Sequence, residues 1–460
     1  MSMRSRPCDW PRKSLSTLPR FDGKLKTGWP GPGGPSYRTS ERASRNGWPR
    51  APMKVLLVNK YFFLKGGAEA VFFETARVLK AKGHSLCFFS MHHPQNFPSS
   101  HSRYFVSQVD FIGSPSWPHQ LKAAGRILYS LEAGRRLSAL IRSEKPDLAH
   151  LHNIHHQISP SILPVLKKNK VPVVMTLHDY KLLCPVYTFY SQGAVCERCA
   201  GGRYFHCLLH KCSKDSYLKS AWNTLEMSLH NTLLDLYGAV DVFICPSRFL
   251  QQKMTRQVEA SRLVYLPNFI SLSAPPRNPL QPDKNIVYCG RLSKEKGLRT
   301  LLRALRGLDA RCQVIGQGPD QPYLEEFARR NALHNVTFLG HKPPEEVKAH
   351  IRDALFTVLP SEWYENHSRA VVESFSLGRA VVASRIGSIP ELVKDGETGL
   401  TFSPGNAEDL RAKMLELMRR PGRALEMGVN ARRFVQEQLE AEVLYPALMN
   451  IYGQALEMDR

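Results

Sequence analysis

Two successive runs of alternating apolar strands and amphipathic helices dominate this chain of 460 residues. The first run starts abruptly at Met53 with a buried-strand pattern over 54–59, and the second starts with a similar strand at 285–289. A Pro-rich interval, 267–282, separates them. Strands that alternate with helices favour mostly parallel sheets covered by helices. We therefore predict an α/β protein with two doubly wound, Rossmann-like domains.

The spacing of apolar residues places the other elements. After a helix at 68–82, strands are expected in the first run at 86–90, 147–150, 171–177, 240–245 and 262–266. In the second run they are expected at 311–315, 336–339, 356–359 and 380–383. The first helix of the second run carries leucines three and four residues apart, the pattern of a core-facing stripe: Leu298, Leu301, Leu302, Leu305 and Leu308.

Composition excludes several classes of protein. No apolar run approaches the roughly 18 residues of a membrane span, and no secretory signal pattern opens the chain. We therefore expect a cytoplasmic protein whose ten cysteines are thiols or metal ligands rather than disulfides. The formal net charge is +23, and residues 1–52 hold eleven Lys and Arg against three Asp and Glu. We expect that segment to be a disordered basic extension, or the product of a misassigned start upstream of Met53.

Glycines follow strand ends in both runs. Gly66 and Gly67 lie between a strand and a helix, and Gly316 and Gly318 follow a strand of the second run. Without a Cβ, such residues let backbone N–H groups approach a phosphate or an acceptor, at the sheet edge where open α/β sheets bind ligands. A tight strand-to-helix turn is the simpler explanation.

Two carboxylates stand out in the second run. Glu365 and Glu373 are eight positions apart and follow a turn signal at 360–361. If 365–377 is helical, both lie on nearly one face about two turns apart, and both can address one elongated ligand. A solvated surface pair is the ordinary alternative.

Taken together, these segments resemble the retaining glycosyltransferases of family 4, of the group 1 type, which have the GT-B fold. The likeness rests on 53–84, on TLHDYKLLCP, CGRLSKEKG and VIGQGP, and on the Glu365–Glu373 pair with SRIGSIPELVKDGETGL. It implies an acceptor-side domain over 53–270 and a nucleotide-sugar-binding domain over 283–436 that face each other across a cleft. A helix within 437–460 would cross back to the first domain.

The resemblance also implies roles for individual residues. Arg291 and Lys296 would hold the diphosphate, His178 would contact the donor sugar from the opposite domain, and Glu365 would approach that sugar. Glu373 would hold the ribose hydroxyls. The expected donor-binding set also contains Gly66, Gly67, Gly290, Gly316, Gly318, Asn366, His367 and Ser368.

The implied activity is transfer of a hexose from a UDP- or GDP-sugar to a saccharide or lipid-linked saccharide in cell-surface polysaccharide synthesis. No Asp-x-Asp occurs in the chain, so we expect no catalytic metal and two cations in its place. One alternative is a non-catalytic homologue that binds a nucleotide. Another is a basic, zinc-dependent nucleic-acid-binding protein, but it gives the donor residues no part, so we expect no nucleic-acid partner.

A cysteine-rich insert occupies 184–212. It holds five of the ten cysteines, with two histidines nearby: Cys184, Cys196, Cys199, Cys207, Cys212, His206 and His210. The single CxxC at 196–199 favours a structural zinc ion bound by four of these groups. Buried free thiols, or a disulfide pair in an exported chain, are the alternatives.

Basic residues recur along an amphipathic pattern at 121–142. They are Lys122, Arg126, Arg135, Arg136 and Arg142, and Lys167, Lys168 and Lys170 follow soon after. Such a face suits peripheral contact with an anionic membrane surface, here the inner face of the membrane. A solvated helix is the alternative.

Overall fold

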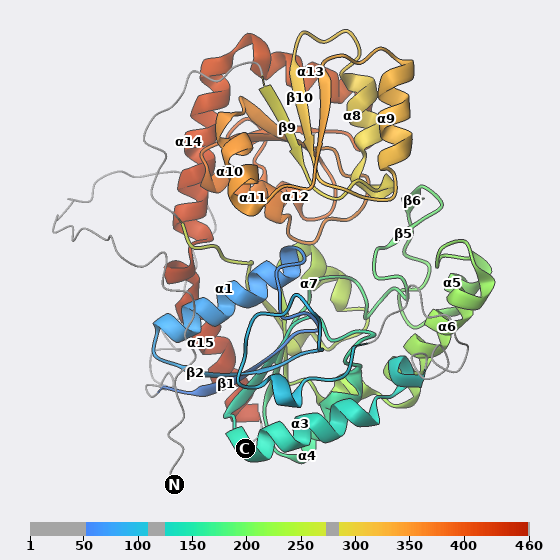
Figure 1. Ribbon diagram of the computed structural model, residues 1–460, viewed down its shortest axis with the longest axis vertical. Helices are drawn as coiled ribbons and strands as arrows, with labels where there is room; N and C mark the ends of the chain where they lie inside the picture. The colour runs from blue at the N-terminus through green and yellow to red at the C-terminus, as the bar shows by residue number, and fades with distance from the viewer. Residues whose placement is uncertain (1–51, 109–124, 273–284, 459–460) are drawn as a thin grey trace, which may run out of the picture.

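The computed structural model describes residues 52–108, 125–272 and 285–458, so the expected extension at 1–52 lies almost wholly outside them. Figure 1 shows two lobes, each built on a six-stranded parallel sheet. The sheet of the first lobe has the order β2-β1-β3-β4-β7-β8, and that of the second β11-β10-β9-β12-β13-β14. The predicted α/β class with two Rossmann-like domains is confirmed.

Eleven of the twelve strands lie within one or two residues of their predicted positions, and the twelfth, β14 (Gly399–Phe402), was not predicted. In the first sheet they are β1 Lys54–Val58, β2 Ser85–Phe89, β3 Leu148–Leu151, β4 Val173–Thr176, β7 Val242–Cys245 and β8 Leu263–Tyr265. In the second they are β9 Asn285–Cys289, β10 Arg311–Ile315, β11 Val336–Gly340, β12 Phe356–Leu359, β13 Ala380–Ser384 and β14 Gly399–Phe402. The central strands are buried along their length, as parallel strands covered on both faces must be.

Helices cover both sheets. The first lobe has α1 Gly67–Ala81, α3 Leu131–Glu144, α4 Leu163–Lys168, α5 Phe205–Leu209, α6 Tyr217–Ser228 and α7 Arg248–Met254. The second has α8 Leu298–Ala304, α9 Gln321–Arg330, α10 Pro344–Asp353, α11 Arg369–Ser376, α12 Ile389–Leu392, α13 Ala407–Arg419 and α14 Pro421–Gln438. The leucine stripe predicted at 298–308 is buried in the core of this lobe, as its spacing indicates.

The last helix, α15 (Ala441–Met458), returns to the first lobe, which confirms the crossing helix. Leu448 and Tyr452 pack with residues of β1, β4 and β7 in one core cluster. The helix begins at Ala441 rather than at 437, because 437–438 complete α14. The chain crosses between the lobes beside Ile270, whose N–H donates to the Leu439 carbonyl at 2.9 Å.

The helix expected over 121–142 is interrupted. Residues 121–124 lie outside the described ranges, and a break at 129–130 separates a short helical turn from α3. The Ser130 hydroxyl accepts the Ala133 N–H and so caps a new helix start. Among the helices that the structure describes, none combines the length and apolarity needed to cross a bilayer.

Candidate active site

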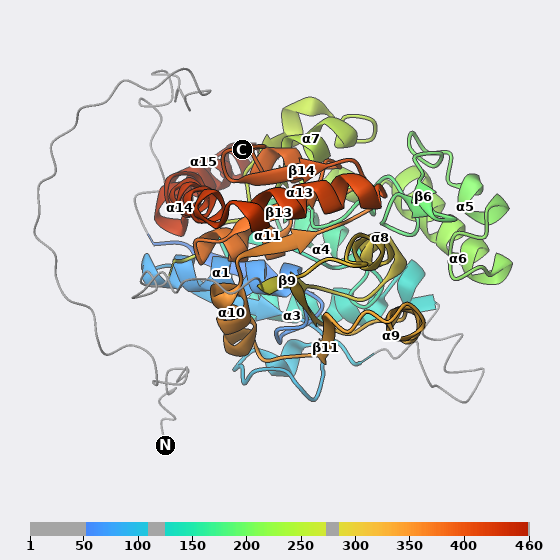
Figure 2. The same ribbon diagram turned by 90° about the horizontal axis from the view of Figure 1, so that it is seen from above.

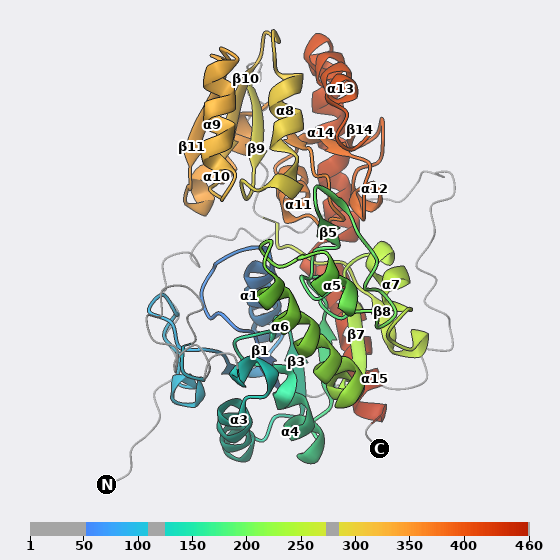
Figure 3. The same cartoon turned by 90° about the vertical axis from the view of Figure 1, so that its right-hand side faces the viewer.

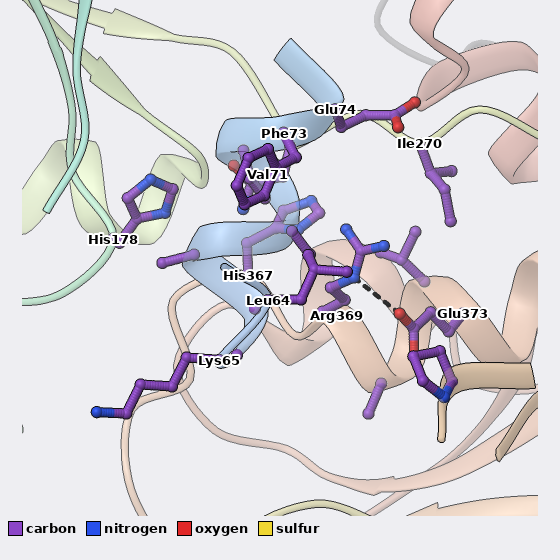
Figure 4. A pocket seen from close by; sticks show the side chains of 18 of the residues that line it. Leu64, Lys65, Val71, Phe73, Glu74, His178, Ile270, His367, Arg369 and Glu373 are labelled. Atoms are coloured by element: carbon purple, nitrogen blue, oxygen red, sulfur yellow. Dashed lines mark hydrogen bonds and ion pairs between the residues drawn. The ribbon is translucent and has the colours of Figure 1, made fainter. Parts of the chain in front are cut away.

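A cleft of about 3070 Å³ runs between the lobes. Its walls come from the start of α1, from the loop after β4, from the loop after β9, and from the segment that leads into α11. Figure 4 shows His178 on one side, with His367, Arg369 and Glu373 on the other. These are the carboxyl ends of parallel strands, where this architecture places ligand sites.

The base of the cleft holds a buried ion pair. The Lys296 ammonium lies 2.7 Å from Glu365 Oε1, and the two side chains are 19% and 8% exposed. The same oxygen accepts hydrogen bonds from Ser361 Oγ at 2.6 Å and from Trp363 Nε1 at 2.9 Å. Lys296 also lies over the Trp363 ring, 4.7 Å from its centroid.

Charge rather than burial decides the ionisation of Glu365. Burial alone would raise the pKa of this carboxyl, but the Lys296 charge and the donors Ser361 and Trp363 outweigh it and leave the pKa lowered. The cleft therefore contains a carboxylate that stays charged at neutral pH, paired with the Lys296 ammonium.

Backbone packing fixes Lys296 beside Glu365. Lys296 ends a 3₁₀ turn, and Gly297 follows with φ of 68°. A Cβ on Gly297 would lie 1.8 Å from the Pro360 carbonyl oxygen, so only glycine allows the lysine loop to approach this strand end. Gly297 was missed in the sequence, although its place after GRLSKEK marks a turn.

The helix expected at 365–377 was placed wrongly. α11 begins only at Arg369, and the Glu365 carbonyl before it accepts the Ser388 N–H at 3.0 Å. Glu365 lies in the loop before the helix, and Glu373 lies on it. Both still line the same cleft, so the inference that they face one ligand does not depend on a shared helix.

Glu373 forms an ion pair within α11. Arg369 Nε donates to Glu373 Oε1 at 2.7 Å, one helical turn away (Figure 4). Burial lowers the pKa of His367 to about 4, so its ring is neutral. Arg291 is exposed and lines the cleft, and its carbonyl accepts the Tyr288 hydroxyl at 2.9 Å.

His178 enters the cleft from the first lobe as the end of a stack of buried imidazoles. His152 Nδ1 lies 2.9 Å from His178 Nε2, and the ring centroids of His150 and His152 are 4.5 Å apart. His150 in turn contacts the Tyr452 hydroxyl of α15 at 2.7 Å. Burial, with a smaller contribution from Lys60, lowers the pKa of His178 to about 3, so it acts as a neutral imidazole.

The predicted glycines lie where backbones meet. A Cβ on Gly316, whose φ is 134°, would lie 1.9 Å from the Gly290 carbonyl oxygen. A Cβ on Gly318 would lie 2.2 Å from the Leu292 carbonyl oxygen. Gly290 and Gly316 line the cleft, as do Gly66 and Gly67 at the start of α1. Asn366 and Ser368 also line it, so every expected donor residue except Gly318 is a cleft residue.

Cysteines of the cysteine-rich insert lie close together, but among the described residues they are not arranged as a metal site. Cys199 and Cys207 are buried together, and Cys212 packs against them. All nine cysteines in the described ranges are free thiols. Within those ranges no three His, Cys, Asp or Glu side chains are grouped to hold a metal ion. Zinc therefore stays a prediction from residue spacing.

Two family models together match most of the chain. Residues 65–274 match the model described as Glycosyltransferase Family 4, and residues 274–434 match the one described as Glycosyl transferases group 1. The chain belongs to glycosyltransferase family 4. The boundary between the two models falls in the interval that separates the two sheets.

Relatives of this family 4 glycosyltransferase agree with that assignment. An uncharacterized glycosyltransferase of Methanocaldococcus jannaschii, MJ1178, is 26% identical over 320 residues, which are 69% of this chain and 78% of the relative. Sucrose-phosphate synthase from Thermosynechococcus elongatus superposes with a TM-score of 0.66 at 17% identity, over 88% of this chain and all of that one. HepE from Anabaena, solved with UDP and glucose, gives 0.60 at 15% identity, over 87% and 99%. These two structures have the same GT-B fold.

Several contacts at the site were not predicted from the sequence. His152, which contacts His178, follows a different strand, and its one local signal is the histidine-rich run HLHNIHH at 150–156. Tyr364 precedes Glu365 and extends into the opposite lobe, where Glu197 accepts its hydroxyl at 2.9 Å. The only local signal for Tyr364 is the aromatic pair that it forms with Trp363 just before Glu365.

Proposed function

We propose that this glycosyltransferase transfers a hexose, with retention of configuration, from a nucleotide-diphosphate sugar to a saccharide acceptor. The observation that carries the proposal is the Lys296–Glu365 pair at the base of the cleft, with His178 opposite it on the other lobe. Such a site offers a cation for a diphosphate and polar groups for a sugar.

Charge explains how the donor would be held. Arg291 and Lys296 supply two positive charges for the diphosphate, and the positive end of α11 adds backbone N–H groups near Asn366, His367 and Ser368. Fixed cations beside a departing diphosphate stabilise the charge that develops on it. Glu373 lies one turn into α11, where its carboxylate would accept hydrogen bonds from the ribose hydroxyls.

Lys296 would exchange partners when the donor binds. With the diphosphate in place, the ammonium would be shared between its oxygens and Glu365, and Glu365 would turn partly to the sugar hydroxyls. His178, being neutral, would donate or accept a hydrogen bond at the sugar without adding charge. These residues bind and orient, and none of them is assigned as a covalent nucleophile.

We propose a nucleoside diphosphate leaving group and transfer without a catalytic metal. The complex of HepE with UDP and glucose supports UDP as the first nucleotide to test. The absence of Asp-x-Asp from the sequence, together with the two cations, supports metal independence. In the expected front-face route, the departing phosphate accepts the proton of the acceptor hydroxyl while the new glycosidic bond forms on the same face.

The acceptor would bind on the side of the first lobe, near Gly66 and Gly67. We propose a saccharide or a lipid-linked saccharide of cell-surface polysaccharide synthesis. The exposed basic residues Arg135, Arg142 and Lys168 of α3 and α4 support peripheral contact with an anionic membrane. Figures 1 and 3 place α3 and α4 at the end of this lobe farthest from the other lobe.

The deciding experiment is a panel of UDP-, GDP- and ADP-sugars, in which release of the nucleoside diphosphate is measured in EDTA and in magnesium. One donor class should be consumed in both buffers. Lys296→Ala should abolish most of that release, whereas Lys294→Ala, an exposed lysine two residues away, should not. Failure of every donor, or equal loss in both variants, would refute the proposal.

A further inference from the structure

Tyr364, immediately before Glu365, is a half-buried residue of the second lobe whose ring packs against the first. Its centroid lies 4.7 Å from that of Phe249 and 6.4 Å from those of Tyr180 and Phe189. It packs against the hydrophobic core of the first lobe. The ammonium of Lys253 lies 5.2 Å from the ring centroid, on the same side of the junction. Tyr364 is therefore an anchor between the lobes.

Glu197 is the polar partner of this anchor. Its Oε1 accepts the Tyr364 hydroxyl at 2.9 Å and the Lys253 ammonium at 2.7 Å, and its Oε2 accepts Arg256 Nη1 at 2.6 Å. Because two cations from the α7 region hold it, the carboxylate has a fixed position. A charged acceptor also makes a stronger hydrogen bond to a hydroxyl than a neutral one does.

The insert supplies this carboxylate. Glu197 is the first residue inside the CxxC motif, between Cys196 and Cys199. Figure 3 shows β5 (Tyr190–Ser191) of the insert reaching up to the level of the second lobe, and Figure 2 shows α5 and α6 projecting to one side. The insert therefore brings a fixed negative charge to the lobe junction.

The residue on the other side of Glu365 is also fixed to the first lobe. Asn366 Nδ2 donates to the Leu177 carbonyl at 2.9 Å, and Ser247 Oγ donates to Asn366 Oδ1 at 3.1 Å. Leu177 is the neighbour of His178. Glu365 thus lies between two residues that both bind the opposite lobe, and its position depends on how the lobes are joined.

We propose that Glu197 is a positioning residue, which acts through Tyr364 to hold the lobes together and to place Glu365 in the cleft. The predicted effect of Glu197 on turnover rests on the proposed function, whereas its predicted effect on the contact between the lobes does not. The insert then joins the two lobes through the turn at the CxxC motif, which carries Glu197.

The test uses three single variants of the full chain and one double variant, which combines Tyr364→Phe with Glu197→Gln. Tyr364→Phe removes only the hydroxyl, and Glu197→Gln keeps the side-chain shape but removes its charge. Glu259→Gln, an exposed glutamate of the same lobe, is the matched control. Small-angle scattering measures the distance between the lobes, calorimetry measures binding of the nucleoside diphosphate, and turnover is measured with the donor found in the panel.

The two test variants should show a larger radius of gyration than the wild type and the control. Turnover should fall roughly 10- to 100-fold, which corresponds to a lost hydrogen bond to a charged group. The affinity for the nucleoside diphosphate should stay within about twofold, because its site lies in the second lobe. The double variant should lose no more turnover than Glu197→Gln alone, since that variant already removes the carboxylate that the Tyr364 hydroxyl binds.

Unchanged scattering profiles in both variants would overturn the proposal, whether or not a donor is ever found. An opened structure with unchanged turnover would overturn the assignment of Glu197 as a positioning residue. Losses that add in the double variant would also overturn it, because they would mean that the two side chains act separately.

Discussion

Removal of the Lys296 side chain should lower both the stability and the activity of the protein, and a second substitution at Glu365 should separate the two effects. In Lys296→Ala the Glu365 carboxylate, which is 8% exposed, loses its only close cation among the described contacts. Loss of one partner of a buried pair costs about 3–5 kcal/mol, and the two remaining donors, Ser361 and Trp363, reduce this to about 2–3 kcal/mol. The melting temperature should fall by roughly 5–10 °C.

The same change should slow transfer on the order of 10²–10³-fold, because a fixed cation no longer stabilises the departing diphosphate. The double variant Lys296→Ala with Glu365→Gln tests the physical reason. It removes the uncompensated charge, so the melting temperature should recover most of its loss while activity stays low. Lys296→Arg should keep the charge and much of the stability.

The assay is a thermal melt of each variant, with the initial rate of nucleotide release from the donor that the panel identifies. Lys294→Ala is the control and should match the wild type in both. Wild-type activity in Lys296→Ala would refute the donor site. A double variant that melts no higher than Lys296→Ala would refute the view that the Lys296 charge chiefly compensates Glu365.

Three further predictions concern binding, pH and metal. Glu373→Ala should weaken nucleoside diphosphate binding measured by calorimetry, while Glu365→Ala should lower turnover with little change in that affinity; the reverse pattern would exchange their roles. Because the pKa values of His150 and His178 fall to about 3, the unfolded state binds protons more readily below pH about 6.5. The contribution of each histidine to the free energy of unfolding is complete above that pH and falls by about 1.4 kcal/mol per pH unit below it. The melting temperature should therefore drop between about pH 7 and 5, and a melting temperature that stays constant over this range would contradict the prediction. Protein purified without chelator should contain roughly one zinc ion per chain in its cysteine-rich insert; five titratable thiols and no zinc would favour the free-thiol alternative.

Local patterns predict the sheets and the cleft well, for a physical reason. Buried parallel strands need continuous apolar runs, and core-facing helices need apolar residues at fixed spacing. Elements such as the leucine stripe at 298–308 can therefore be predicted from their own sequence. Cleft residues such as Lys296 follow strand ends, and strand ends share one edge of the sheet. The family resemblance then assigned roles that spacing alone could not.

Contacts between distant segments were not predictable in the same way. The Tyr364–Glu197 hydrogen bond joins residues 167 positions apart. The early position of Glu365 before α11 depends on Ser388, which no helical period signals. The cysteine spacing indicated a cluster, but not that the carboxylate inside the CxxC would bind the other lobe.

The most direct test of the central claim is proton magnetic resonance of the anomeric signal during transfer from the donor that the panel selects, in buffer that contains EDTA. The account predicts that donor is consumed without added metal and that the first product has the anomeric configuration of the donor. An inverted product, or turnover that starts only when a divalent cation is added, would contradict retaining, metal-independent transfer at the Lys296–Glu365 site.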